Sequence, residues 1–181
     1  MEKNITSEKR IRKIAIVGPE STGKTVLAEK LARHFQTEWV PEYAREYLNR
    51  IDRPYKKDDL EVIAMEQINL ENNLEKKASR LLICDTTLLV IKIWCEFRYQ
   101  DCPAWIRDEV NHRHYDLHLL TATDVPWSPD PQREHPHLRD YLFGLYLNEI
   151  RELGIVYEVI SGTYEERLKR SIERINFLLS T

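Results

Sequence analysis

The sequence has few of the features that mark disulfide-rich, membrane-spanning or nucleic-acid-binding proteins. Its three cysteines are an odd number without C-x-x-C spacing, which argues against a disulfide framework and against a zinc site. No apolar run approaches the ~20 residues of a membrane span, and the first ten residues lack an apolar signal core. The formal net charge of −3 gives no bulk attraction for nucleic acid. We therefore expect a soluble, cytoplasmic protein that binds neither a membrane nor nucleic acid.

Glycine is also scarce, and two of the five glycines lie in residues 18–25, G-P-E-S-T-G-K-T. An apolar run at residues 13–17 precedes this segment and a helical pattern follows it, which is the context of a phosphate-binding P-loop. In such a loop Lys24 reaches the β- and γ-phosphates of ATP and the Thr25 hydroxyl holds Mg²⁺. The residues expected to contact ATP here are Gly18, Glu20, Ser21, Thr22, Gly23, Lys24 and Thr25.

Strand-like and helical patterns alternate along the whole chain. The expected strands cover residues 12–17, 38–40, 80–85, 117–120 and 155–160, and the expected helices cover 25–35, 42–50, 58–78, 87–99, 103–111, 138–153 and 163–178. This alternation, together with the phosphate-binding loop, predicts a single α/β domain over residues 1–181 of the P-loop NTPase class. It would have a five-stranded parallel sheet, helices on both faces and a lid. Residues 1–10 read as a flexible lead-in, with a nucleic-acid-binding arm as the alternative.

Polar residues follow the second and third predicted strands, where ligands bind in such sheets. Asp85 ends an apolar strand and would hold Mg²⁺ with Thr25; the alternative is that it caps the next helix, which Thr86 and Thr87 would begin. Glu42 would take a proton from an acceptor hydroxyl or bind ribose, and Arg45 would neutralise phosphoryl charge. The alternative is a surface helix with ion pairs between residues three apart.

The segment 121–136 contains four prolines, one tryptophan and one arginine, which is typical of a lid or binding loop. Trp127 would pack on a substrate ring or plug the space under the loop. Arg133, or else Arg139, would clamp phosphates when the lid closes. After the last strand, Gly162 and Thr163 form a turn and a helix cap that, by analogy with P-loop kinases, lies beside adenine.

The remaining aromatic and imidazole side chains suggest no further site. Core or half-buried positions are expected for Tyr43, Trp94, Trp105 and Tyr141. Surface or hydrogen-bonded positions, rather than a metal site, are expected for His112, His114, His118, His135 and His137.

Taken together, several motifs resemble the ribosylnicotinamide kinase domain of NadR-type proteins. They are GPESTGKT, VPEYAREYL, a strand ending in DTT, DVPWSPDPQR and SGTYEERLKR, spread over residues 11–175. The P-loop is generic, whereas E-Y-x-R-E-Y followed by P-W-x-x-D-x-x-R is more specific. The resemblance implies a nucleoside/nucleotide kinase-like fold. It also implies transfer of phosphate from ATP, with Mg²⁺, to the 5′-hydroxyl of nicotinamide riboside, a step of pyridine nucleotide salvage in NAD biosynthesis. It puts Lys24, Asp85, Glu42 and Arg133 at the chemistry and adds Tyr43, Arg45, Gln67 and Trp127 on the substrate side.

Two positions depart from the family pattern. Better-known members carry Trp immediately before E-Y-x-R-E-Y and Tyr on the long helix, which resemble a sandwich for the nicotinamide ring; here these positions are Pro41 and Ile68. The kinase chemistry is therefore better supported than the nicotinamide specificity. The chain also lacks the H-x-G-H signature and the helix-turn-helix of multifunctional relatives, which predicts a stand-alone kinase domain.

Other readings stay open at this point. A nucleoside monophosphate kinase needs further basic residues for the acceptor phosphate, which Arg45, Arg50 and Arg53 would supply. A kinase for another nucleoside is a further alternative. A nucleotide-dependent ATPase or switch that binds a protein partner is the alternative from another class. Either Glu42 or Asp85 would act as the base, and the oligomeric state stays open.

Overall fold

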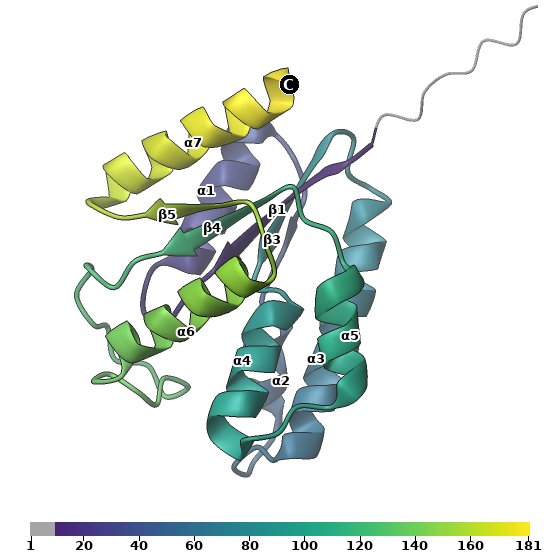
Figure 1. Cartoon of the computed structure of the whole chain (residues 1–181), viewed down its shortest axis with the longest axis vertical. Helices are drawn as coiled ribbons and strands as arrows, with labels where there is room; N and C mark the ends of the chain where they lie inside the picture. The colour runs from purple at the N-terminus through teal and green to yellow at the C-terminus, as the bar shows by residue number, and fades with distance from the viewer. Residues whose placement is uncertain (1–9) are drawn as a thin grey trace, which may run out of the picture.

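Five parallel strands form the centre of the structure, a computed structural model that describes residues 10–181 (Figure 1). The strands are β1 (Arg12–Val17), β2 (Trp39–Val40), β3 (Leu81–Asp85), β4 (Leu117–Thr121) and β5 (Tyr157–Ile160). The helices are α1 (Lys24–Phe35), α2 (Tyr43–Arg50), α3 (Lys57–Glu75), α4 (Leu88–Tyr99), α5 (Ala104–His112), α6 (Arg139–Glu152) and α7 (Tyr164–Ser180). The lead-in expected at residues 1–10 lies outside the described residues except for Arg10.

The sheet order, β2-β3-β1-β4-β5, determines where a ligand can bind. Strand β1 lies at the centre and pairs with β3 on one side and β4 on the other. In this register Ile16 lies opposite Asp85 and Val17 opposite Leu120, so the carboxyl ends of three strands meet where the segment 18–25 begins. The connection after β1 runs to β2 at one edge, whereas the connection after β3 crosses to β4 on the other side of β1, so the switch point at which open parallel sheets bind ligands lies between β1 and β3.

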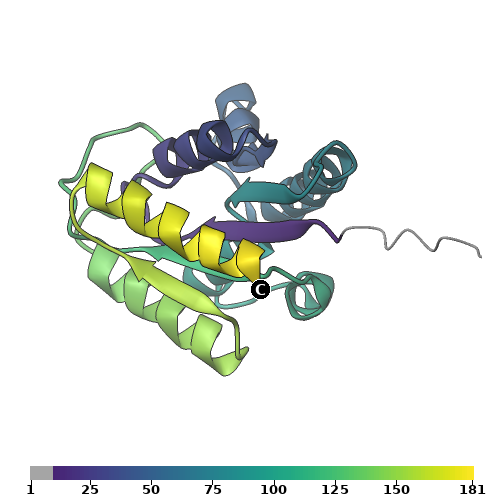
Figure 2. The ribbon, with the colours of Figure 1, turned by 90° about the horizontal axis from the view of Figure 1, so that it is seen from above.

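Helices cover both faces of the sheet. Helices α1 and α7 pack on one face against alternate strand residues such as Ile14, Ile83 and Leu119, all fully buried. Helices α4 and α6 pack on the other face against Ala15, Val17 and Leu120, and α3 covers the edge near β2. Figure 2 shows the sheet between α1 and α7 on one side and α6 on the other. In the part of the chain that the structure describes, no helix is long and apolar enough to cross a membrane.

Four local expectations are corrected by the structure. Helix α4 begins at Leu88, not at Thr86 or Thr87, because Thr86 adopts a left-handed φ of 72° and Thr87 is extended, with a φ of −134° and a ψ of 177°. Helix α3 begins at Lys57, and Asp59 stabilises its start from inside the first turn by accepting the Lys56 N–H at 2.6 Å. Tyr141 is exposed, since it lies on the outer face of α6. His118 is buried in β4, and its Nδ1 finds no hydrogen-bond partner among residues 10–181.

Candidate active site

The glycine-rich loop is shaped by its contact with β4. Gly18 has a φ of 140°, and a Cβ atom there would lie 2.5 Å from the hydroxyl oxygen of Thr121, so only glycine fits. Thr22 shares a 2.7 Å hydrogen bond with the same hydroxyl and donates to the Pro19 carbonyl at 2.8 Å. The Thr22 side chain is therefore part of the loop's own scaffold, and its contribution to a phosphate site would come from the backbone. The loop leads into α1, whose N-terminus favours an anion.

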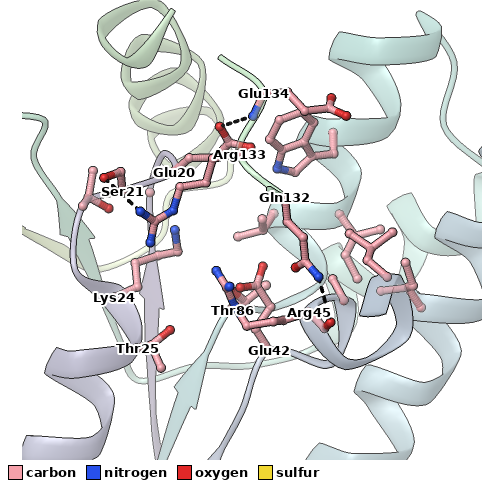
Figure 3. A pocket seen from close by; sticks show the side chains of 18 of the residues that line it. Glu20, Ser21, Lys24, Thr25, Glu42, Arg45, Thr86, Gln132, Arg133 and Glu134 are labelled. Carbon is pink, nitrogen blue, oxygen red and sulfur yellow. Dashed lines mark hydrogen bonds between the residues drawn. The ribbon is translucent and has the colours of Figure 1, made fainter. Parts of the chain in front are cut away.

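Two cations converge beside this loop. Figure 3 shows the ammonium group of Lys24 and the guanidinium group of Arg133 directed toward the same space. Lys24 Nζ donates to the Pro19 carbonyl at 2.8 Å, and Arg133 Nη1 donates to Ser21 Oγ at 3.4 Å. Like charges placed together repel unless an anion lies between them. The arrangement suits the phosphates of a nucleotide.

A buried carboxylate and a hydroxyl form a pair at the end of β3. Thr25 Oγ1 donates to Asp85 Oδ2 at 2.6 Å, and Asp85 is fully buried. Burial, aided by the nearby Glu42 carboxylate and opposed by Lys24, raises the pKa of Asp85 to about 7. Among residues 10–181, Asp85 Oδ1 has no hydrogen-bond partner. A carboxylate oxygen without a partner beside a hydroxyl is a donor set that fits Mg²⁺.

Thr86 is a member of the site that the sequence analysis missed. It lines the cavity, its φ is 72°, and its buried hydroxyl lacks a partner within residues 10–181. A positive φ is rare for a β-branched residue and concentrates at functional sites. No local sequence signal marks it, because the conformation is imposed by the hydrogen bond from the Thr86 N–H to the Ile16 carbonyl (3.1 Å) across the sheet.

The residues predicted to lie on the substrate side begin at the N-terminus of α2. Glu42 and Arg45 line the cavity, and Arg45 Nη1 contacts Asp130 Oδ2 at 2.9 Å. This hydrogen bond raises the pKa of Arg45. Gln67, from α3, accepts the Tyr43 N–H at 2.8 Å and donates to the Pro41 carbonyl at 3.1 Å. Gln67 thus fixes the entry into α2, while the Tyr43 ring packs among the helices outside the cavity lining.

A cavity of about 180 Å³ joins the glycine-rich loop to a chamber between α2, α3 and α4. The chamber walls include apolar and aromatic side chains that the sequence analysis did not place at the site. They are Leu48, Tyr55, Leu60, Ile63, Val90, Ile91 and Trp94. The positions that depart from the family pattern, Pro41 and Ile68, are outside this lining.

The loop between β4 and α6 lies over the cavity as a lid. Glu20 Oε2 accepts the backbone N–H group of Glu134 at 3.1 Å (Figure 3) and that of His135 at 3.2 Å. Ser21 Oγ accepts the Ser128 N–H at 2.8 Å. Burial raises the pKa of Glu20, and the two lid N–H groups oppose that rise. The side chains of the glycine-rich loop therefore hold the lid down.

Two other lid expectations find different neighbours. Arg139 is buried and donates to the backbone carbonyls of Ser21 (3.1 Å) and Val125 (2.9 Å), so it supports the lid base and does not face the cavity. Its burial lowers its pKa. Trp127 lies over the guanidinium of Arg139 at 6.0 Å and is outside the cavity lining. Of the lid residues singled out in the sequence, Arg133 alone lines the cavity.

The turn after β5 is tied to the same loop from behind. Thr163 is the N-cap of α7, as expected, and forms a capping box with Glu166. The Gly162 N–H donates to Asp124 Oδ2 at 2.6 Å, and the buried Arg167 joins the Gly162 carbonyl (2.9 Å) to the Thr22 carbonyl (3.0 Å). Gly162 and Thr163 are outside the cavity lining, and their contact with adenine stays a prediction.

Comparison with known proteins identifies relatives over nearly the whole chain. A family model described as an AAA domain matches residues 13–167. The trifunctional NAD biosynthesis/regulator proteins NadR of Salmonella typhimurium and Escherichia coli are each 25% identical to this chain over 177 residues. The match covers 93% of this chain and 43% of each relative, so the chain spans less than half the length of these relatives. The predicted resemblance to NadR-type proteins is confirmed.

Solved structures give the same fold. A crystal structure of NadR protein in complex with NR has a TM-score of 0.82 at 20% identity, covering 94% of this chain and 52% of that one. A thymidylate kinase from Ehrlichia chaffeensis has a TM-score of 0.60 at 16% identity, covering 92% and 98%. The fold is that of the P-loop nucleoside and nucleotide kinases, as the sequence predicts.

Proposed function

Since the chain belongs to the AAA domain family, we propose that it is an ATP-dependent kinase that phosphorylates a hydroxyl of a small nucleoside-like acceptor. The observation that carries the proposal is one continuous cavity. A phosphate-binding loop and two cations lie at one end, and a chamber with Glu42 and Arg45 lies at the other. A switch or simple ATPase needs no such chamber. The 25% identity to NadR over 93% of the chain supports a kinase of the same kind.

In the proposed reaction the acceptor hydroxyl oxygen forms a bond to the γ-phosphorus of ATP. The bond from that phosphorus to the β–γ bridging oxygen breaks, and ADP leaves. Lys24 and Arg133 stabilise the charge that spreads over the transferred group. Glu42 takes the hydroxyl proton, because it lines the cavity, whereas Asp85 is fully buried and bonded to Thr25.

Thr25 and Asp85 are the residues that would hold Mg²⁺. The unpartnered Oδ1 atom of Asp85 and the adjacent Thr25 hydroxyl fit the ion. When bound, the ion supplies positive charge that neutralises the phosphate oxygens. We also propose that the enzyme works in the cytoplasm, where ATP is abundant.

For the acceptor we propose nicotinamide riboside rather than a nucleoside monophosphate. A second phosphate would need free cations on the acceptor side. Arg50 pairs with Glu46, and Arg53 pairs with Asp59 at 2.7 Å; neither lines the cavity. Of these three arginines only Arg45 lines the cavity, and it pairs with Asp130 at 2.9 Å, so none of the three is left unpaired for a second phosphate.

A panel of ribosides, nucleotides and vitamins with ATP and Mg²⁺ tests the proposal. We expect nicotinamide riboside to be converted to its 5′-phosphate with one ADP formed per product, as measured by chromatography and mass spectrometry. Glu42→Gln should lower kcat by about 100-fold, the usual contribution of a general base. Glu46→Gln, on the exposed side of the same helix, should leave kcat within about twofold of the unaltered value.

Three other outcomes would each change the conclusion. Phosphorylation of a different riboside alone would replace the acceptor and keep the kinase. Phosphorylation of a nucleoside monophosphate would overturn the argument from Arg50 and Arg53. If no compound accelerates ADP formation, the chain is a nucleotide-dependent switch.

A further inference from the structure

The acceptor chamber contains two aromatic rings, but they come from other positions than the sequence pattern suggested. Trp94 lies on α4, and Tyr55 lies in the loop before α3; both line the cavity. Pro41 is exposed and Ile68 packs among the helices, so a ring could not be sandwiched between these two side chains. The aromatic surface for a ring is therefore supplied from a different helix.

The Trp94 indole is fixed from outside the cavity. The His135 ring is stacked on it with a centroid distance of 5.6 Å and an interplanar angle of 25°. Phe97 meets it edge-on at 5.9 Å. Neither His135 nor Phe97 lines the cavity, so both hold the indole from behind. A ring platform that is held rigid before binding loses little entropy when a ligand stacks on it.

Apolar side chains of α3 and α4 line the cavity together with Trp94. Leu60 and Ile63 are three residues apart on α3, and Val90 and Trp94 are four apart on α4, so each pair lies on the helix face that borders the cavity. Tyr55 directs its hydroxyl to Glu134 Oε2 at 3.4 Å, and burial raises its pKa. The chamber thus offers flat contact area, with Glu42 and Arg45 at its entrance to the glycine-rich loop.

We propose that Trp94, which shares the cavity lining with Tyr55, is the platform on which the aromatic ring of the acceptor stacks, and that it replaces the sandwich absent at positions 41 and 68. This inference rests on the proposed kinase function and identifies the residue that determines acceptor specificity. A flat ring, neutral or cationic, is the chemistry that an indole face recognises. Acceptors without an aromatic ring, such as free ribose, are poor substrates for the same reason.

Steady-state kinetics of Trp94→Ala test the proposal. The probe is nicotinamide riboside, or the riboside that the panel shows to be phosphorylated. We expect the KM for the riboside to rise about 5- to 100-fold, as removal of a base-stacking aromatic does elsewhere, with the KM for ATP within about twofold. Trp105→Ala is the matched control, because its indole lies on α5, donates to Glu61 at 2.7 Å and is outside the cavity lining. Its acceptor KM should not change.

A second measurement does not depend on the alanine variant folding. Titration of the riboside, without ATP, should quench the fluorescence of the unaltered protein and of Trp127→Phe, and should quench Trp94→Phe much less. If Trp94→Phe is quenched as strongly as the unaltered protein, the proposal is wrong. If quenching is lost in Trp127→Phe instead, the acceptor ring stacks on Trp127 of the lid and the proposal is wrong.

Failure of this inference is distinguishable from failure of the proposed function. An active kinase whose acceptor KM is unchanged in Trp94→Ala overturns the platform and keeps the function. An equal rise in the KM of ATP and of the acceptor also overturns it, since that result reports general damage. If the unaltered protein phosphorylates no compound of the panel, the proposed function has failed.

Discussion

Two residues of this structure have energetically unfavourable features, a strained backbone in one and, in the other, a buried polar atom that lacks a partner in the described part of the chain. Thr86 keeps a left-handed backbone beside Asp85, and the buried Nδ1 of His118 has no partner among residues 10–181. Such features cost free energy of unfolding, of the order of 1–3 kcal/mol each for backbone strain. The strain at Thr86 lies at the site, whereas His118 lies within β4, away from the cavity. Thr86 is therefore relevant to function, whereas His118 is relevant to stability.

His118 predicts an acid-sensitive stability. Burial, aided by His114, lowers the pKa of His118 to about 3, while the unfolded chain should titrate near 6.5. Below pH 6.5 the His118 side chain therefore binds a proton in the unfolded state but not in the folded state. The free energy of unfolding consequently falls as the pH is lowered to about 3. Between pH 7.5 and pH 5 this residue alone should lower the free energy of unfolding by about 2 kcal/mol.

Urea unfolding at pH 7.5 and pH 5 measures this effect. His118→Leu should remove about 2 kcal/mol of the difference between the two pH values. His137→Leu, an exposed residue of the lid, should leave the difference unchanged. An identical pH dependence in His118→Leu and the unaltered protein would show that His118 is not the group responsible.

At the scale of elements, the lid and the glycine-rich loop behave as one unit. Glu20 and Ser21 accept backbone N–H groups from residues 128, 134 and 135, and Arg45 of α2 pairs with Asp130. The lid thus joins the donor loop to the acceptor helix. Arg133 owes its position over the cavity to these contacts.

Removing the Glu20 carboxylate should loosen the lid. In Glu20→Ala we expect faster proteolytic cleavage within residues 122–138 and a fall in kcat/KM of about tenfold or more. The reason is that two hydrogen bonds to a charged acceptor, each about 1.5–3 kcal/mol, are lost. Glu20→Gln keeps an amide oxygen as acceptor and should lose less. Glu29→Ala, exposed on α1, should match the unaltered protein in both assays. Unchanged cleavage in Glu20→Ala would mean that the lid is held by its other contacts.

At the scale of the whole molecule, the nucleotide should act as a clamp across the sheet. The glycine-rich loop is fixed by β4 through Thr121, by α7 through Arg167 and by the lid through Glu20. A ligand that binds this loop in the folded state alone raises the free energy of unfolding of the entire domain.

Thermal unfolding tests this coupling. At a concentration 100 times its Kd, ATP with Mg²⁺ should add about 2.7 kcal/mol, which corresponds to a rise in Tm of about 5–10 °C for a chain of this size. Lys24→Ala should abolish most of the rise while its Tm without nucleotide stays within a few degrees of the unaltered protein. A full nucleotide-induced rise in Lys24→Ala would remove Lys24 from the phosphate site.

The sequence by itself determined the fold class, which the structure confirms, and it predicted the donor half of the site. Alternating apolar runs and helical spacing are local patterns, and residues 18–25 are contiguous, so neighbouring residues suffice to predict them. Asp85 and Glu42 were predicted to lie at the site because each follows a strand, and the carboxyl ends of parallel strands meet at one edge.

Only the tertiary structure decided the acceptor half. Tyr55, Ile63 and Trp94 belong to three separate segments, and the packing of α2, α3 and α4 alone brings them to one chamber. The same holds for Glu20, whose partners are more than a hundred residues away along the chain. Side chains that meet through packing leave no spacing signal in the sequence. For this reason the sequence predicted what supplies the phosphate, and the structure was needed to propose what receives it.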